Sequence, residues 1–384
     1  MRILQVGKFY HPAKGGIETH LRLLATGLHR HARVQVLVSG EPRASLENID
    51  GIPVERLSMS ASLLSTPICP GLINSLRKAE CDVVHIHLPN PWAAIAYLAS
   101  SCKQPLVVTY HSDIVRQTVT EPAFRPLLLR FLKRACAIIC SSPALIEHSP
   151  ILRRFRDKCV VVPFGIAADA FDEPNASEVK AIRDRHKGPI ILAVGRLVYY
   201  KGFDYLIRAM RSVDASLIII GKGPLRDSLK QLANSLGVLN KITLLEHVSD
   251  VRPYNHAADL FVLPSVARSE AFGIVQLEAM AAGKPVINTH LRSGVPYVSQ
   301  HGITGLTVPP SDEAALTAAM NCLLRDPDLR RRYGLAAKLR VLEEFTSAKM
   351  ISKTLSLYDA IVADPNQLPS VSSQERSFAA SNQM

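Results

Sequence analysis

Two glutamates, Glu270 and Glu278, stand eight residues apart in the chain. A strand-like run, Asp259–Ser265, precedes them, and a helix-like run that ends at Gly283 follows. This order predicts one carboxylate at the mouth of a helix and the other about two turns inside it. Carboxylates in apolar surroundings usually accept hydrogen bonds, and sugar hydroxyls are neutral donors that they can orient. The pattern therefore favours a hydroxyl-binding pair, and a solvated helix face is the alternative.

Two cations lie on a loop after another strand-like run. Gly195 and Arg196 follow Ile190–Val194, and Lys201 stands before the next helix-like run. A guanidinium and an ammonium group beside a helix N-terminus would form charge-assisted hydrogen bonds to phosphate oxygens. The loop therefore predicts a clamp for a diphosphate, although one basic residue on a surface loop is unremarkable.

A double glycine, Gly15 and Gly16, stands between the first expected strand and a helix-like run. Glycines at such a turn let the backbone approach a ligand closely, and the free amides of the helix favour a phosphate. A tight turn without a ligand is the alternative. The pattern is not the glycine fingerprint of dinucleotide-binding folds.

Two further loops could shape a nucleotide pocket. Gly221 follows the strand-like run Leu217–Ile220, but the segment lacks the second half of a Walker A loop, which excludes a P-loop ATPase. His247 and Val248 follow the run Ile242–Leu245, where their backbone groups could meet a base.

One histidine, His111, stands just past the carboxyl end of the strand-like run Leu106–Thr109. Open α/β sheets bind ligands at this end of their strands. His111 could hydrogen-bond a substrate or stabilise charge in a transition state, and capping of the next helix is the alternative. His85 and His87 form a second pair at a strand end, for which we expect a structural role.

Short runs of Val, Ile and Leu alternate with helical stretches along the chain. Such runs are typical of parallel strands buried on both faces, and the alternation indicates βαβ units. There are too many strands for one compact open sheet. We therefore expect an α/β fold with two Rossmann-like, doubly wound parallel-sheet domains that face a central cleft, the expected active site.

The domain boundary is expected near Val162–Asp169, where a polar stretch follows the last strand of the first half. This gives an N-terminal domain at 1–165 and a C-terminal domain at 170–345. An amphipathic helix is expected at about 346–362, and the Pro- and Ser-rich tail, 364–384, is expected to be disordered.

Composition excludes several classes of protein. The chain is 47% hydrophobic and 20% charged, which is typical of a globular protein. It has no apolar run of the ~18 residues that cross a bilayer and no signal peptide at its N-terminus, so we expect a cytoplasmic protein. Seven scattered cysteines without a Cys-x-x-Cys pair indicate reduced, structural thiols and no metal site.

The net charge of +12 is concentrated in the first domain, where residues 1–165 carry +9. Such a surface can bind nucleic acid, anionic lipid or phosphorylated substrates. Aromatic residues are few and are not interleaved with basic ones, so we rank nucleic acid last. The stretch Pro122–Arg134 places cations among bulky apolar residues and could lie on an anionic membrane; an ordinary half-buried domain helix is the alternative.

In their order across two domains, these residues resemble glycosyltransferase family 4, the retaining GT-B enzymes. The match covers roughly residues 1–362. It rests on four motifs: Gly15-Gly16, His111, Gly195-Arg196 with Lys201, and the Glu-x7-Glu motif of Glu270 and Glu278. The tract from Ser293 to Leu306 is also similar to bacterial members of the family.

The resemblance implies a role for each matching residue. Arg196 and Lys201 would bind the donor diphosphate and stabilise it as it leaves, and Gly16 would offer its amide to the same phosphates. Glu278 would hold the ribose hydroxyls.

Glu270 would contact hydroxyls of the transferred sugar, and His111 would face the donor hexose. The backbone amides that would assist Glu270 are those near Phe272, Gly273 and Ile274. The C-terminal helix would pack back on the N-terminal domain.

The resemblance also implies retaining transfer without an enzymic nucleophile, in which the leaving phosphate deprotonates the acceptor. We assign neither glutamate as nucleophile, general acid or general base. Enzymes of this type typically need no metal, so the resemblance implies no metal or other cofactor.

The preferred donor is GDP-mannose, because the chain looks most like bacterial mannosyl- or rhamnosyltransferases of surface polysaccharide and lipopolysaccharide synthesis. UDP-glucose and UDP-GlcNAc remain alternatives. The acceptor would be a saccharide or a polyprenyl-diphosphate-linked saccharide, reached at the inner face of the cell membrane. The competing functions are a sugar-nucleotide 2-epimerase and a non-catalytic nucleotide-sugar binder; a nicotinamide oxidoreductase is disfavoured by the missing glycine fingerprint.

Overall fold

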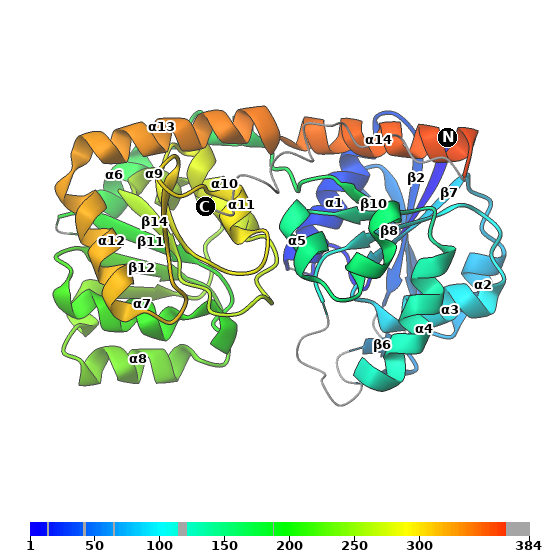
Figure 1. The fold of residues 1–384 in the computed structure, drawn as a ribbon, viewed down its shortest axis with the longest axis horizontal. Helices are drawn as coiled ribbons and strands as arrows, with labels where there is room; N and C mark the ends of the chain where they lie inside the picture. Colours follow the sequence, from blue (N-terminus) through cyan, green and yellow to red (C-terminus); the bar gives the residue numbers. More distant parts are fainter. Residues whose placement is uncertain (14, 41–43, 64–65, 114–120, 187, 366–384) are drawn as a thin grey trace. The chain divides into compact units, whose positions relative to one another are not determined.

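The structure is a computed structural model of the chain, and it describes residues 1–13, 15–40, 44–63, 66–113, 121–186 and 188–365 (Figure 1). The chain divides into two compact units. Unit 1 comprises Met1–Phe164 and the chain from Ser347 onward, and unit 2 comprises Gly165–Thr346. The tail expected at 364–384 lies outside the described residues beyond residue 365.

Unit 1 is built on an eight-stranded sheet with the order β10-β9-β8-β7-β1-β2-β4-β3. All neighbouring strands in it are parallel except β3 and β4. The strands are β1 (Arg2–Val6), β2 (Arg33–Ser39), β3 (Ser45–Ile49), β4 (Ile52–Leu57), β7 (Val83–Leu88), β8 (Leu106–Tyr110), β9 (Ala137–Cys140) and β10 (Cys159–Val161). A separate antiparallel ribbon consists of β5 (Ala61–Leu63) and β6 (Thr66–Ile68).

Helices cover both faces of this sheet. They are α1 (Gly16–His29), α2 (Gly71–Arg77), α3 (Pro91–Ser100), α4 (Glu121–Arg134), α5 (Pro143–His148), the 3-10 helix η1 (Leu152–Lys158) and α14 (Ser347–Ala363). Alternate residues of β1 point to opposite faces of the sheet. Leu4 and Val6 pack toward α2, α3 and α4, whereas Ile3 packs toward α1 and α14. Both faces are therefore buried, as expected for a parallel sheet.

Unit 2 is built on a six-stranded, wholly parallel sheet with the order β13-β12-β11-β14-β15-β16. The strands are β11 (Ile190–Val194), β12 (Ser216–Ile220), β13 (Ile242–Leu245), β14 (Leu260–Leu263), β15 (Val286–Thr289) and β16 (Gly305–Val308). The α-helices are α6 (Ala176–Asp184), α7 (Phe203–Ala209), α8 (Arg226–Ser235), α9 (Arg252–Ala257), α10 (Ile274–Ala281), α11 (Val295–Val298), α12 (Glu313–Arg325) and α13 (Pro327–Glu344). Single 3-10 turns are η2 (Ala168–Phe171), η3 (Tyr199–Lys201), η4 (Met210–Ser212) and η5 (Leu239–Lys241).

The strand order of each sheet reverses at one point. In unit 2 the chain runs outward from β11 through β12 to β13, then returns to the other side of β11 with β14. In unit 1 it runs outward from β1 through β2 to β4 and β3, then returns beside β1 with β7. Loops diverge at such a point and leave a crevice beyond the carboxyl ends of the strands, where doubly wound sheets bind ligands.

Three local features differ from the sequence-based expectation. The antiparallel edge strand β3 was not expected, and its residues are almost all exposed and partly polar, so they form no apolar run. The β5–β6 ribbon was not expected either. Helix α10 begins at Ile274, which places Glu278 at its fifth residue, little more than one turn inside the helix.

No helix within the described residues combines the length and the apolarity that crossing a bilayer requires.

Helix α14 returns to unit 1 from the far end of the chain and packs beside α1 (Figure 1). Its buried residues Met350, Leu357, Tyr358 and Ile361 recur at helical spacing and join the apolar core on the α1 face. Strand β1 and helix α14, which are some 350 residues apart in sequence, thus pack in the same apolar core.

Replacing Leu357 with alanine should destabilise unit 1 by about 2–5 kcal/mol, because a fully buried leucine leaves a cavity when truncated. Calorimetric unfolding measures this loss. The exposed neighbour Lys353 is the matched control, since Lys353→Ala should change stability by less than about 0.5 kcal/mol. Equal effects of the two substitutions would contradict the packing of α14 described above.

Candidate active site

Lys201 and Glu270 form a buried ion pair in unit 2. They lie on the loops that follow β11 and β14, the two strands at which the sheet order reverses. Each residue is only 8% exposed, and the Ser265 hydroxyl also donates to the Glu270 carboxylate, Oγ to Oε2, at 3.0 Å. The two charges are therefore held at the switch point of the sheet with little water around them.

The backbone brings these two loops together. The Val266 amide donates to the Tyr200 carbonyl at 2.8 Å. Gly202 adopts a left-handed conformation, with φ of +65°, and a Cβ atom at this position would lie 2.1 Å from the Pro264 carbonyl oxygen. Only glycine satisfies both conditions, so this position allows the close approach of the Lys201 loop to the end of β14.

Glycines also form the floor beside Lys201. A Cβ atom at Gly221 would lie 1.8 Å from the Gly195 carbonyl oxygen, so the loops after β11 and β12 are in contact. A Cβ atom at Gly195 would lie 3.2 Å from the Lys201 ammonium nitrogen. The structure thus brings together Gly195, Lys201, Gly221 and Glu270, which we call the unit 2 cluster.

The mouth of α10 lies on the same loop as Glu270. Gly273 precedes the helix with φ of +74° and, as a glycine, provides no side-chain cap to the first amides of the helix, which begins at Ile274. Phe272 is buried, and its carbonyl accepts a hydrogen bond from the Gln276 side chain at 3.0 Å. Backbone amides without a side-chain cap at a helix N-terminus favour an anion or a hydroxyl oxygen.

The remaining expected residues of unit 2 lie on the loops after β11 and β13 and in α10. Arg196 is exposed, and no ion-pair partner for it is found among the described residues. His247 is exposed and Val248 is half-buried on the loop after β13. Glu278 is half-buried in α10, where burial and the nearby Asp250 carboxylate raise its pKa to about 7.

The double glycine of unit 1 lies at the start of α1. Gly15 precedes the helix in an extended conformation, Gly16 is its first residue, and Lys14 lies outside the described residues. A Cβ atom at Gly16 would meet nothing within 4 Å, so there is open space beside it. At Gly15, however, the Glu18 carboxylate lies 2.2 Å from where a Cβ would be, so a carboxylate already lies against this helix mouth.

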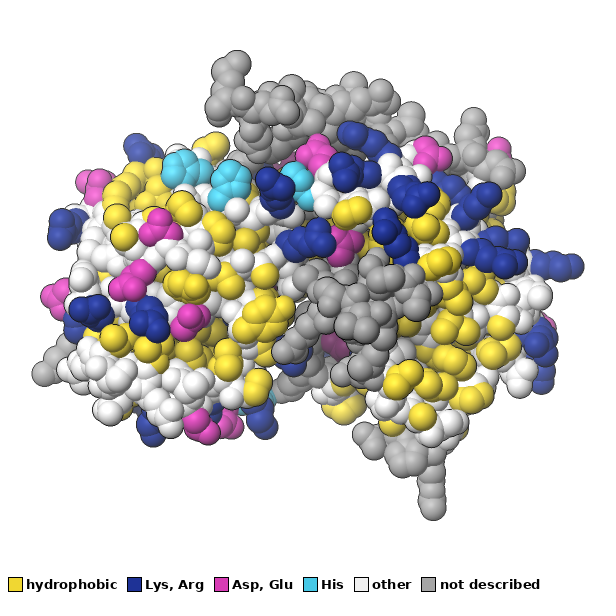
Figure 2. Space-filling model, turned by 60° about the horizontal axis from the view of Figure 1, so that its bottom comes forward, with side chains coloured by type: hydrophobic (Ala, Val, Ile, Leu, Met, Phe, Trp, Pro, Cys, Tyr) yellow, Lys and Arg dark blue, Asp and Glu magenta, His cyan; other side chains and the backbone are white. Residues whose placement is uncertain are grey.

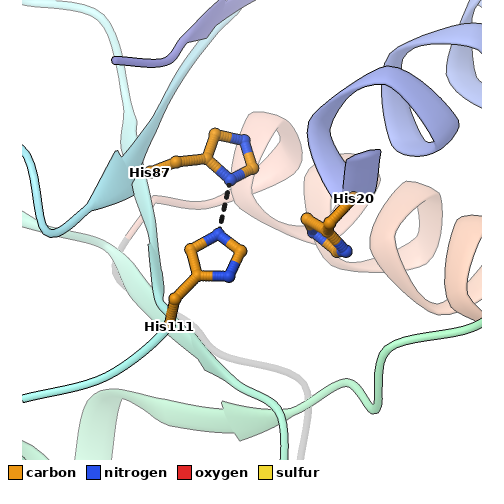
Figure 3. A group of neighbouring side chains, drawn as sticks. All are labelled: His20, His87 and His111. Atoms are coloured by element: carbon orange, nitrogen blue, oxygen red, sulfur yellow. Dashed lines mark hydrogen bonds between the residues drawn. The ribbon is translucent and has the colours of Figure 1, made fainter. Parts of the chain in front are cut away.

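Three buried histidines surround the switch point of unit 1: His20 on α1, His87 on β7 and His111 just after β8 (Figure 3). We call them the histidine cluster. Nδ1 of His87 and Nε2 of His111 are joined by a hydrogen bond of 3.1 Å. Burial lowers the pKa of His20 to about 3 and holds the pKa values of His87 and His111 well below 6.5, so all three imidazoles are neutral.

One ring nitrogen from each of these histidines lies within 4.8 Å of the others, a spacing at which they could hold a metal ion. In this structure, however, a hydrogen bond joins the facing nitrogens of His87 and His111, so one of these two nitrogens carries a proton. The residues therefore suit a hydrogen-bonding role and would need a change of tautomer to bind a metal.

Of the histidine cluster, sequence reasoning singled out only His111 as a candidate site residue. A structural role was expected for His87, which contacts His111 directly; His20 was not singled out at all. One signal was present, because His20 stands one turn inside the helix that follows the first strand. Its proximity to His111 depends on α1 lying beside the residue that follows β8, which the sequence alone does not show.

The raised pKa of Glu278 has a consequence for stability. In the unfolded chain this carboxyl ionises near its ordinary pKa of 4.5, whereas in the folded protein it keeps its proton until about pH 7. Folding is therefore disfavoured progressively as pH rises from about 5 to 7.

Glu278→Gln removes this loss, so the melting temperature of the variant relative to wild type should rise between pH 5 and pH 7.5 and then level off. The exposed Glu173→Gln is the control and should show a difference that does not depend on pH. Parallel melting curves for Glu278→Gln and wild type across this range would refute the assignment.

Comparison with known proteins gives a consistent result for both units. Residues 14–170 match the family model described as glycosyltransferase family 4, and residues 175–340 match the model described as glycosyl transferases group 1. The D-rhamnosyltransferase WbpZ of Pseudomonas aeruginosa is 34% identical, covering 90% of this chain and 93% of its own. The O-antigen chain mannosyltransferase C of Escherichia coli is 30% identical, covering 94% and 99%.

Among solved structures, Anabaena HepE in complex with UDP superposes with a TM-score of 0.79 at 21% identity, over 94% of this chain and all of that one. Sucrose-phosphate synthase from Thermosynechococcus elongatus superposes with a TM-score of 0.77 at 22% identity, over 94% and 100%. These likenesses show the GT-B fold. Both family models match this chain, and two transferases that it covers almost completely are at least 30% identical to it. The chain therefore belongs to glycosyltransferase family 4.

Proposed function

We propose that this glycosyltransferase moves a hexose, with a mannose-type sugar preferred, from a nucleoside-diphosphate sugar to a saccharide or lipid-linked saccharide acceptor. The reaction would retain the configuration of the transferred sugar and serve cell-surface polysaccharide synthesis. The observation that carries the proposal is the buried Lys201–Glu270 pair at the switch point of the unit 2 sheet. The relatives named as rhamnosyl- and mannosyltransferases support the class of sugar.

The proposed diphosphate site consists of Lys201 and Arg196. Lys201 is held in place by its ion pair, so its ammonium group needs little reorganisation to meet a phosphate. Arg196 is exposed on the same loop and can add a bidentate contact. Negative charge grows on the diphosphate as the sugar leaves, and these two cations stabilise that charge. The Gly16 amide at the start of α1 is proposed to contact the same phosphates.

Glu270 is proposed to contact hydroxyls of the transferred sugar, with the amides at the start of α10. Its carboxylate already accepts from Lys201 and Ser265, which leaves acceptor capacity for a hydroxyl. We assign no nucleophilic role to it. The leaving phosphate is proposed to take the proton of the acceptor on the same face of the sugar, which accounts for retention. No metal ion or other cofactor is part of this proposal.

Glu278 is proposed to hold the ribose hydroxyls of the donor. An ionised carboxylate is the acceptor that two hydroxyls require. Binding of the ribose would then favour the ionised form of a group whose pKa is raised to about 7 in the free protein. The residues near the base, Gly221, His247 and Val248, offer backbone contacts. GDP-mannose is the preferred donor, with UDP-glucose and UDP-GlcNAc as alternatives, and the UDP complex of HepE supports a nucleotide in this class of fold.

We further propose that unit 1 attaches peripherally to an anionic membrane from the cytoplasmic side, where a polyprenyl-diphosphate-linked saccharide would be the acceptor. Helix α4 exposes Arg130, Lys133 and Arg134. The neighbouring η1 is linked to it by the Lys158 ammonium group, which donates to the Lys133 and Ala135 carbonyls at 2.8 Å. Figure 2 shows Lys and Arg side chains gathered on unit 1 beside apolar ones. Such a mixture suits a surface of anionic lipid.

Arg196→Ala should lower the turnover of sugar transfer by roughly a hundredfold or more, the usual loss when one donor to a developing anion is removed. Radiolabelled GDP-mannose, UDP-glucose and UDP-GlcNAc with a lipid-linked saccharide acceptor provide the assay. Arg211→Ala, another exposed arginine of unit 2, is the control and should leave turnover unchanged.

Unaltered sugar transfer by Arg196→Ala would contradict the assignment of Arg196 to the diphosphate site. Conversion of the donor sugar in the absence of any acceptor would indicate an epimerase, and binding of the donor without transfer would indicate a non-catalytic binder. Either result would contradict the proposed reaction.

The membrane proposal is tested by flotation with liposomes that contain phosphatidylglycerol. Wild-type protein should float at low salt, and Lys133→Glu with Arg134→Glu should remain at the bottom of the gradient, because reversed charge repels the anionic surface. Liposomes of phosphatidylcholine alone are the control. Failure of the wild-type protein to float at low salt would rule the attachment out.

A further inference from the structure

A chain of hydrogen bonds connects the C-terminal helix to His111 through the interior of unit 1. Gln5 of β1, which is fully buried, lies at its centre. The Gln5 side-chain amide donates from Nε2 to the Tyr358 hydroxyl at 3.0 Å, and its Oε1 lies 2.9 Å from Nε2 of His87. Nδ1 of His87 is in turn bonded to Nε2 of His111 at 3.1 Å. The histidine pair is thus tied to a tyrosine contributed by α14.

A third buried histidine forms hydrogen bonds at the outer end of this chain. The Tyr358 hydroxyl lies 2.5 Å from Nδ1 of His85, and Nε2 of His85 lies 2.7 Å from the Thr109 hydroxyl. His85, Thr109 and Tyr358 are all at most 1% exposed. Buried polar groups in a connected network of this kind fix one another's orientation, because each alternative arrangement leaves a further buried group without a partner.

The donor and the acceptor can be assigned for each hydrogen bond between Gln5, His87 and His111. Burial keeps each imidazole neutral, so each carries one N–H group and one lone pair. The carbonyl oxygen of Gln5 can only accept, so Nε2 of His87 is the protonated nitrogen. Nδ1 of His87 must then accept from Nε2 of His111. The second nitrogen of His111, Nδ1, is left with its lone pair.

His111 is 5% exposed and lies at the end of the strands where doubly wound sheets bind ligands. His111 follows β8 beside the switch point of the unit 1 sheet, and no hydrogen-bond partner for its Nδ1 is found among the described residues. A lone pair on a neutral, nearly buried imidazole suits a neutral O–H donor, whereas it would repel a phosphate oxygen.

We propose that Gln5 and Tyr358 are positioning residues: through His87 they hold His111 with Nδ1 unprotonated, so that it accepts a hydrogen bond from a hydroxyl of the sugar substrate. The proposal rests on the sugar transfer put forward above. It gives α14 a role in substrate recognition besides its packing in the core, because the helix supplies the hydroxyl that orients the Gln5 amide.

The tautomers can be measured directly on the full chain. Protein labelled with nitrogen-15 at histidine should show, by long-range nitrogen–proton correlation spectra, an unprotonated Nδ1 and a protonated Nε2 on His111. Assignment comes from the His111→Ala variant. In Tyr358→Phe the Gln5 amide loses its acceptor, so the His111 signals should move toward the other tautomer. A protonated Nδ1 in the wild-type protein, or His111 signals that Tyr358→Phe leaves unchanged, would overturn the proposal.

Kinetics test whether the orientation matters to the reaction. Tyr358→Phe should lower kcat/KM for sugar transfer by roughly tenfold, about the worth of one hydrogen bond. In a His111→Ala background the same substitution should have no further effect, because it acts through His111. Tyr97→Phe, which removes a different buried tyrosine hydroxyl of unit 1, is the control for a general loss of stability. Additive effects of Tyr358→Phe and His111→Ala would overturn the proposal.

Three further results separate a failure of this proposal from a failure of the proposed sugar transfer. If Tyr358→Phe does not fold, Thr109→Val removes the outer end of the network and should move the His111 signals in the same direction; no movement would count against the proposal. If the wild-type protein transfers no sugar while the tautomers are as stated, the proposed function fails and the network stands. Activity that is lost on chelation and restored by zinc would contradict the network, because both bridging nitrogens would then face the metal.

Discussion

The buried ion pair of Lys201 and Glu270 is the interaction around which unit 2 is organised. Removing one partner of such a pair costs about 3–5 kcal/mol, because a charge is left behind in an apolar interior. Lys201 and Glu270 stand on loops that are about seventy residues apart in sequence. The fold therefore has to hold these two loops in contact in one arrangement. A backbone hydrogen bond from Val266 to Tyr200 and the left-handed Gly202 achieve this contact. The strand order places it at the switch point, where a parallel sheet binds ligands.

Unit 1 uses the same kind of sheet in a different way. At its switch point it gathers neutral imidazoles in place of charges, and burial keeps them neutral. Their hydrogen bonds extend through Gln5 to Tyr358 of α14. The two units therefore differ in the chemistry that they can offer. The charged cluster of unit 2 suits a diphosphate, and the neutral cluster of unit 1 suits hydroxyl groups.

Sequence reasoning succeeded where the signal was local. The runs of Val, Ile and Leu predicted buried parallel strands, and the fold class and the family are confirmed. Some expected site residues stand just past the end of a strand, because that rule needs only the end of a strand and the residue after it, and their roles stay predictions. His111 after β8 and Gly195 after β11 are examples.

The sequence could not show which of these residues touch. Lys201 and Glu270 were assigned to different groups of the donor, whereas the structure pairs them directly. Gln5 and Tyr358 gave no signal, since a glutamine inside an apolar strand and a tyrosine on an amphipathic helix are ordinary features. Their meeting depends on the return of α14 to β1. The edge strand β3 was missed because its exposed residues form no apolar run.

If the proposed function is right, the loops of unit 2 hold a nucleoside diphosphate beside the Lys201–Glu270 pair. The most direct test is a crystal structure of the protein with GDP or UDP. We expect phosphate oxygens within hydrogen-bonding distance of Lys201 and Arg196, with the ribose hydroxyls hydrogen-bonded to Glu278. A nucleotide bound without contact to either cation, or on another edge of the sheet, would contradict it.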